Sequence, residues 1–261
     1  MLILLPPSEG KAPTDVGQPF SIHALSLPEL TPTRARALAA LTKLSAGRES
    51  RALDVLGLTP RQTTELARNR ELIDARALPA SQVYTGVLFA ALDYASLPAA
   101  ARRRVDRWVL VFSGLWGAVH LDDVIPAYRL SGDVSLPRLG TVASVWRRPL
   151  AKVIPEAADS GVVLDLRSGT YAKMWTPEPS LAERTVVARV LQERPDGSRM
   201  VVSHHNKATK GRLVRALASG GRTPQTIESL AALIESHGVV TELRAGRPGK
   251  PWSLDLVVDE L

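Results

Sequence analysis

Short apolar runs alternate along the chain with segments in which apolar residues recur every three or four positions. Uninterrupted apolar runs are typical of buried strands, whereas the wider spacing is typical of the helices that cover them. The apolar runs predict strands at 1–5, 108–112, 161–166, 185–193, 199–205, 239–243 and 252–258. The wider spacing predicts helices at 27–44, 99–107, 141–158 (broken or kinked at Pro149), 208–218 and 223–236, two short helices within 50–74, and an extended piece leading into a helix over 79–88.

The alternation of strands and helices predicts an α/β fold in which helices flank a mixed β-sheet. Pro195-Asp196-Gly197 lies between two of the expected strands and predicts a hairpin there. A chain of 261 residues could form one or two domains. Since no linker divides the pattern, we expect a single compact domain over residues 1–261.

Residues 48–72 have the outline of a helix–hairpin–helix element. Gly57 lies between the two short helices, and Thr59-Pro60 begins the second one. In such an element the hairpin amides and the second helix N-terminus contact a DNA phosphate without reading bases. Gly57, Arg61 and Arg68 would then lie beside the phosphate chain. The alternative is an ordinary two-helix hairpin that packs on the core.

Three of the apolar runs end in small or polar residues with cations nearby. The segments are Ser8-Glu9-Gly10-Lys11, Ser113-Gly114 and Ser168–Lys173. Ligands bind at the carboxyl ends of strands in open α/β sheets, and glycine lets backbone N–H groups approach an anion. The three segments therefore predict one shared cleft, unless each is only a tight turn with a helix cap. None has the pattern of a nucleotide-binding glycine loop.

The sequence has a net charge of +7, from seven lysines and 26 arginines against 26 acidic residues. A basic chain favours polyanionic partners. The strongest cluster contains Lys207, Lys210 and Arg212, and no carboxylate occurs between Asp196 and Glu228. At the start of a helix, this cluster predicts a phosphate or DNA contact. A solvated basic helix would have the same composition.

A second basic stretch has no acidic residue between Asp133 and Glu156. It contains Arg138, Arg147, Arg148 and Lys152, with Trp146 among them. An aromatic residue beside arginines suits stacking on bases. The alternative is a core tryptophan beneath a charged rim.

Cysteine is absent from the sequence. This excludes disulfides, thiolate nucleophiles, iron–sulfur clusters and cysteine-ligated zinc. The histidines have no metal-ligand spacing, so no metal or cofactor is expected. The sequence has neither a long apolar window nor a signal peptide, so we expect a cytoplasmic protein without a membrane partner. The oligomeric state stays open.

Several blocks, taken in order, resemble the YaaA peroxide stress family over nearly the whole chain. The blocks are MLILLPP at the start, Val83–Gly86, Phe112–Gly117, Pro126–Leu130, Val145-Trp146, Leu164–Lys173 and Lys207–Gly211. The opening loop and the 204–211 block depart from the family pattern. The resemblance implies a compact α/β protein with a positively charged cleft and a helix–hairpin–helix element. It further implies hydrogen peroxide resistance, lowered free iron and binding of double-stranded DNA.

Motif matching carries nine polar positions over as an anion-binding cleft. They are Lys11, Tyr84, Ser113, Arg129, Ser168, Tyr171, Lys173, Lys207 and Lys210. Two functions are expected from them. In the first, the protein binds duplex DNA without base specificity under peroxide stress. In the second, it is an enzyme whose cleft takes a nucleotide-like or phosphorylated small molecule, with Lys11 as the candidate catalytic residue.

Overall fold

Parallel strands form the centre of the main sheet, and the N-terminal strand β1 lies among them. The computed structural model describes residues 1–193, 199–201 and 203–258. In the described residues the sheet has the order β12-β13-β10-β9-β1-β4-β5, and β11 pairs with β10. Its strands are β1 (Leu2–Leu5), β4 (Val109–Ser113), β5 (Gly117–Val119), β9 (Val163–Asp165), β10 (Thr185–Glu193), β11 (Arg199–Val201), β12 (Val240–Arg244) and β13 (Trp252–Val258).

The direction of the strands changes only toward the edges of this sheet. β1 pairs in parallel with β4 and β9, and β10 pairs in parallel with β9 and β13. β5, β11 and β12 are antiparallel to their neighbours. Every residue of β1 and β4 is buried, as expected for parallel strands covered on both faces. The predicted mixed sheet in an α/β fold is therefore confirmed.

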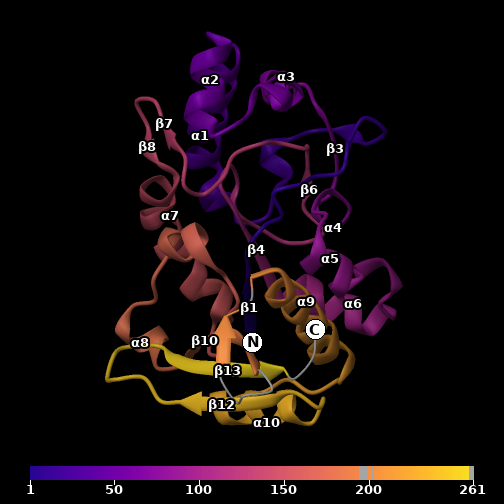
Figure 1. The fold of residues 1–261 in the computed structure, drawn as a ribbon, viewed down its shortest axis with the longest axis vertical. Coiled ribbons are helices and arrows are strands. Elements are labelled where there is room, and N and C mark those ends of the chain that lie inside the picture. Colours follow the sequence, from indigo (N-terminus) through magenta and orange to yellow (C-terminus); the bar gives the residue numbers. More distant parts are fainter. Residues whose placement is uncertain (194–198, 202, 259–261) are drawn as a thin grey trace.

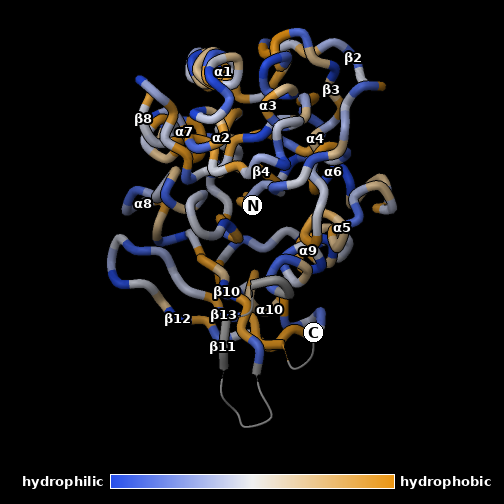
Figure 2. The backbone as a smooth tube through the Cα atoms, turned by 45° about the horizontal axis from the view of Figure 1, so that its top comes forward, coloured by the Kyte–Doolittle hydropathy of each residue, from blue (hydrophilic) through white to orange (hydrophobic). Residues whose placement is uncertain are grey.

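Helices cover the sheet on two sides, and further helices lie beyond one end of it. Figure 1 shows α5, α6 and α9 together on one side, α7 and α8 on the other, and α1, α2 and α3 at one end. The α-helices are α1 (Thr31–Ser45), α2 (Glu49–Leu56), α3 (Thr63–Arg70), α4 (Ala80–Val83), α5 (Val87–Leu92), α6 (Ala99–Trp108), α7 (Val142–Ala158), α8 (Pro179–Ala182), α9 (Ser203–Ser219) and α10 (Ile227–Glu235). The hydropathy colouring of Figure 2 shows hydrophobic stretches along β10, β13, α5 and α10.

Short elements complete the end of the molecule that carries α1, α2 and α3. Two small sheets lie there, one of β2, β3 and β6 and one of β7 and β8. The short strands are β2 (Gln18–Pro19), β3 (Arg76–Pro79), β6 (Val124–Ile125), β7 (Ser135–Leu136) and β8 (Gly140–Thr141). The 3-10 helices are η1 (Ile22–Ala24), η2 (Pro28–Leu30), η3 (Pro60–Gln62), η4 (Tyr94–Ser96) and η5 (Gly169–Met174). No described helix has the length and apolar character needed to cross a membrane.

The boundaries of several predicted elements are wrong. The helix expected from residue 208 begins at Ser203, and the helix expected from residue 223 begins at Ile227. The helix expected from residue 27 begins at Thr31, because Leu27 has a φ of 57° and η2 precedes the α-helix. α7 has its predicted bounds to within one residue and is not broken at Pro149, which lies inside the helix. The strand expected to reach residue 205 ends at Val201, and residues 203–205 already belong to α9, where no apolar residue favours a strand. The predicted hairpin tip at 195–197 lies outside the described residues.

Candidate functional site

β1 and β9 lie side by side, and the chain leaves them in opposite directions across the sheet. From β1 the chain continues to β4, whereas from β9 it continues to β10 on the other side. Such a switch of direction opens a crevice at the carboxyl ends of the two strands. A cavity of about 450 Å³ lies there, which we call the switch-point cavity. It is lined by residues 6–10 after β1, 85–89 at the start of α5, 168–171 after β9, and Lys207 on α9.

The nine predicted cleft residues separate into three groups. Ser168, Tyr171 and Lys207 line the switch-point cavity. A second group lies in or beside the cavity wall without lining it: Lys11, Tyr84, Ser113, Arg129 and Lys210. The ninth residue, Lys173, is exposed and does not line this cavity. The fold therefore brings the three predicted strand ends to one region. Only three of the nine predicted side chains line the cavity itself.

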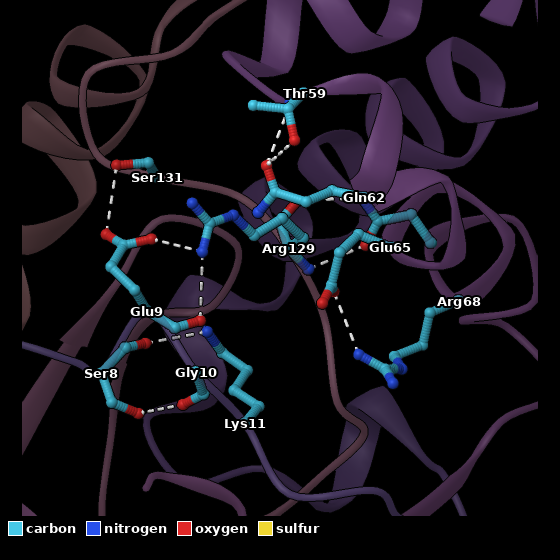
Figure 3. Close-up of polar contacts among 11 residues, drawn as sticks. Ser8, Glu9, Gly10, Lys11, Thr59, Gln62, Glu65, Arg68, Arg129 and Ser131 are labelled. Carbon is cyan, nitrogen blue, oxygen red and sulfur yellow. Dashed lines mark hydrogen bonds and ion pairs between the residues drawn. The ribbon is translucent and has the colours of Figure 1, made fainter. Parts of the chain in front are cut away.

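Glu9 lines the switch-point cavity and pairs with Arg129, which lines a second cavity and not this one. The Glu9 carboxylate lies 2.8 Å from Arg129 Nη1 and accepts a 3.4 Å hydrogen bond from Ser131 Oγ. Figure 3 shows the two side chains turned toward Glu9 from the loop at 129–131. Glu9 also lines the second cavity, which has a volume of about 260 Å³ and reaches Gly57. A carboxylate thus separates the two cavities and neutralises one of the predicted anion-binding cations.

Lys11 lies beneath the loop that forms one wall of the cavity. Its Nζ donates a 3.0 Å hydrogen bond to the Ser8 carbonyl and lies 4.2 Å from the centre of the Tyr128 ring. Burial lowers the pKa of Lys11 to about 8, and nearby Glu9 opposes this change. In this position the ammonium group fixes the course of residues 8–11. Chemistry on a ligand in the cavity would require this loop to move.

Tyr84 and Ser113 meet through Tyr128 in a buried hydroxyl network. The Tyr128 hydroxyl lies 3.1 Å from the Tyr84 hydroxyl and 2.6 Å from Ser113 Oγ. Ser113 Oγ also accepts hydrogen bonds from the backbone N–H groups of Leu115 and Trp116. Burial raises the pKa of Tyr84 to about 12, so its hydroxyl stays protonated at neutral pH. These hydroxyls brace the turn after β4 and do not face the cavity.

The floor of the cavity is fixed by two buried cations. Arg167 forms a 2.6 Å ion pair with Asp165 and donates to the carbonyls of Tyr171 and Trp175. Lys210 Nζ donates a 2.8 Å hydrogen bond to the carbonyl of Leu166, and burial lowers its pKa to about 8. Because these contacts use the backbone on either side of Ser168, they hold the residues that line the cavity in place.

The predicted helix–hairpin–helix element contains α2, a three-residue turn, η3 and α3; we call residues 49–70 the α2–α3 hairpin. Gly57 ends α2 with a φ of 63°, a left-handed conformation that glycine adopts readily. The turn amides already donate within the chain: Gly57 N to Asp54 O, Leu58 N to Leu53 O, and Thr59 N to Gln62 Oε1. Phosphate contacts from this hairpin would therefore come from its side chains.

The predicted DNA-contact residues occupy two separate regions. Arg61 is exposed next to Gly57, whereas Arg68 forms a 3.0 Å ion pair with Glu65 on α3. Lys207 and Arg212 lie on α9, which both ribbon views place apart from α2. Exposed Arg48 and Arg51, which were not among the predicted residues, precede Gly57 in sequence. The hairpin and α9 therefore form two basic regions rather than one.

Asn69 connects the α2–α3 hairpin to the loop that carries Arg129. Its fully buried amide donates to the Arg129 carbonyl at 2.8 Å and accepts from the Arg129 N–H at 2.9 Å. Sequence reasoning missed Asn69, Glu9 and Tyr128. Glu9 lies two residues before Lys11, and Tyr128 directly precedes Arg129. This closeness in sequence to predicted site residues could have identified both. No group of three or more metal-ligating side chains occurs in the described residues.

The sequence is similar to known proteins over most of its length. A family model described as peroxide stress protein YaaA matches residues 1–238. A UPF0246 protein of Streptomyces coelicolor is 51% identical, and the match covers all of both chains. A UPF0246 protein of Corynebacterium glutamicum is 37% identical over 99% of this chain and 100% of its own. A protein of Campylobacter jejuni that is described as uncharacterized is 25% identical over 89% of this chain and 90% of its own.

Proposed function

Because the chain belongs to the YaaA family of peroxide stress proteins, we propose that it binds the backbone of duplex DNA without base specificity. In this proposal the bound protein protects DNA during peroxide stress and helps to limit intracellular free iron and oxidative damage. The resemblance supplies the link to peroxide and iron. The contact with DNA rests on the α2–α3 hairpin.

The observation that carries the proposal is a set of unpaired guanidinium groups on the α2–α3 hairpin and directly before it. Arg48, Arg51 and Arg61 are exposed, and their side chains make no ion pair or hydrogen bond within the described part of the chain. Guanidinium groups bind phosphate oxygens through two parallel N–H donors. Contacts to phosphate position a protein on DNA but carry no sequence information. Binding would therefore be insensitive to base sequence and sensitive to salt.

Reversing two of these charges, as R51E together with R61E, is expected to weaken DNA binding by roughly tenfold or more at low salt. The slope of log affinity against log salt should fall by about 1.8, since each lost phosphate contact removes about 0.9. Fluorescence anisotropy with labelled duplexes of about 20 bp would measure both quantities. Two unrelated sequences should bind equally well to the unchanged protein.

R103E with R247E is the matched control for this experiment. Both arginines are exposed, lie outside the hairpin, and make no side-chain ion pair in the described residues. The control changes net charge by the same amount and should change affinity much less. If the two double variants bind DNA equally, or if the unchanged protein does not bind DNA at low salt, the hairpin is not the DNA contact.

A second candidate function is favoured by the switch-point cavity itself. Its volume of about 450 Å³ suits a small molecule, and its lining combines Lys207 with backbone around Gly169 and the aromatic rings of Phe89 and Tyr171. Lys207 would bind a phosphate group, while the Glu9 carboxylate would accept hydrogen bonds from hydroxyl or amine groups. We propose a phosphorylated sugar or nucleotide-like ligand as the alternative occupant.

K207M is expected to abolish stabilisation by such a ligand. At a ligand concentration about 100 times Kd, binding stabilises a folded protein by about 2.7 kcal/mol, which raises Tm by several degrees. Thermal melting with nucleoside monophosphates and sugar phosphates would detect this shift in the unchanged protein. K250M, at an exposed lysine that does not line the cavity, is the control and should keep the shift. The absence of any shift in the unchanged protein would contradict this candidate.

A further inference from the structure

Some of the charged side chains hold the backbone of the protein itself and are not free to bind a ligand. Several arginines donate to backbone carbonyl groups from buried or half-buried positions: Arg34, Arg104, Arg167 and Arg215. High arginine content alone therefore does not indicate a surface for polyanions. The arginines that remain unpaired are more informative about binding.

Unpaired cations gather along a groove between α1 and α7, which we call the α1–α7 groove. Its volume is about 440 Å³, and its lining includes Arg36 from α1 and Arg148 and Lys152 from α7. All three side chains are exposed, and within the described residues none makes an ion pair or a hydrogen bond. The lining contains one carboxylate, Glu29. The groove is therefore strongly cationic and has no internal anion in contact with these groups.

The sequence around α7 adds further positive charge at the edge of the groove. Arg138 is exposed in the turn between β7 and β8, and Arg147 is exposed on α7. No acidic residue occurs between Asp133 and Glu156. Arg148 and Lys152 are four residues apart, so they project from one face of α7 with about 6 Å of helix rise between them. This arrangement presents a row of cations rather than a single one.

Both walls of the groove are anchored in the core, so the cations stand on a rigid platform. Arg34 ties α1 to the carbonyls of Trp116 and Ala118. Trp146 ties α7 to the carbonyl of Gly114 through a 2.8 Å hydrogen bond from its Nε1. Trp146 is fully buried, so it is a core residue and is not available to stack on bases. No aromatic side chain lines the groove, which favours duplex over single-stranded nucleic acid.

The groove lies on the same side of the molecule as the α2–α3 hairpin. α1 packs against α2, α3 and α7, and β7 packs against both α1 and α2. Figures 1 and 2 both show α1, α2, α7 and the β7–β8 turn together at this end. We propose that the α1–α7 groove is a second phosphate-binding surface for duplex DNA, continuous with the hairpin surface. This inference rests on the proposed function, because it extends the same DNA contact.

The test compares three double variants of the full chain by fluorescence anisotropy in a salt series. The groove variant is R148E with K152E, the hairpin variant is R51E with R61E, and the control is R103E with R247E. The groove variant should lose roughly tenfold or more in affinity for a duplex of about 20 bp, and its salt slope should fall by about 1.8. The control should lose much less. R148Q with K152Q, which avoids new acidic neighbours on α7, should show the same slope change.

The outcomes separate the groove from the proposed function. If the groove variants bind like the control while the hairpin variant loses affinity, the groove inference is overturned and the hairpin proposal stands. Equal losses in the groove and control variants would indicate an effect of net charge and would also overturn the groove inference. Absence of DNA binding by the unchanged protein at low salt would overturn both. Circular dichroism and thermal melting would establish that each variant is folded.

Discussion

Replacing Arg34 by methionine is expected to lower the free energy of unfolding by about 4 kcal/mol. Arg34 is fully buried on α1, and its guanidinium donates to four backbone carbonyls. The acceptors are Trp116 O at 3.0 Å, Ala118 O at 2.8 Å, Ser26 O at 2.7 Å and Leu27 O at 3.3 Å. Burial lowers the pKa of Arg34 to about 10, so the group stays charged at neutral pH. Methionine would fill part of the space but remove all four hydrogen bonds, although Trp116 O and Leu27 O would still accept from the N–H groups of Ala118 and Leu30.

Urea unfolding followed by circular dichroism would measure this loss. R36M makes the same chemical change two residues away at an exposed position and should alter the free energy of unfolding by no more than about 0.5 kcal/mol. R34K keeps a charge but lacks the planar set of donors, so it should remain clearly destabilised. A loss below about 1 kcal/mol for R34M would mean that the carbonyls find other donors, contrary to this account.

Raising the pH from about 7.5 to about 9.5 is expected to stabilise the unchanged protein relative to the K11M/K210M variant by about 2 kcal/mol per lysine. Burial lowers the pKa of Lys11 and of Lys210 to about 8 in the folded protein. An unfolded lysine has a pKa of about 10.4. Between these values the unfolded chain holds protons that the folded protein has released. Stability therefore rises with pH across this interval, and below it both states are protonated.

The measurement is the free energy of unfolding of the unchanged protein and the variant in urea at a series of pH values. Taking the difference between the two proteins removes the contribution of other groups that titrate in this range. K43M/K250M replaces two exposed lysines and should follow the unchanged protein at every pH. A constant difference between the unchanged protein and K11M/K210M would show that the two buried amines keep ordinary pKa values.

The central strands could be predicted because they are buried on both faces and appear in the sequence as uninterrupted apolar runs. β1 and β4 illustrate this, since each is buried throughout. Element ends were less predictable because local backbone geometry decides them. The left-handed conformation of Leu27 and the entry into α9 at Ser203 are examples, and hydrophobic pattern alone indicates neither.

Part of the candidate site followed from the same reasoning. Ser168 and Tyr171 line the cavity because parallel strands bring their carboxyl ends to one edge. Pairs that are distant in sequence could not be foreseen: Glu9 meets Arg129, and Asn69 meets the Arg129 backbone. Lys173 was predicted to line the cleft because it lies in one of the family motifs. Its side chain is instead exposed on the short helix η5.

The spacing of apolar residues in α1 could have predicted that Arg34, unlike most other arginines, is buried. Arg34 lies three or four positions before Ala37 and Leu38, and so on the apolar face of α1, whereas Arg36 lies on the opposite face. A charged residue at an apolar position of a helix indicates a buried partner. In an arginine-rich chain, this criterion distinguishes structural guanidinium groups from those available to a ligand.

The position of β1 between β4 and β9 has a consequence for biosynthesis. Residues 2–5 cannot acquire both neighbours until the ribosome has translated residue 165. At elongation rates of about 5–20 residues per second, this interval lasts about 8–30 s. Throughout that time the edge of β1 that pairs with β9 has no partner strand and is open to other nascent chains. The order of the sheet therefore favours slow refolding, because β1 must find partner strands that lie far along the chain.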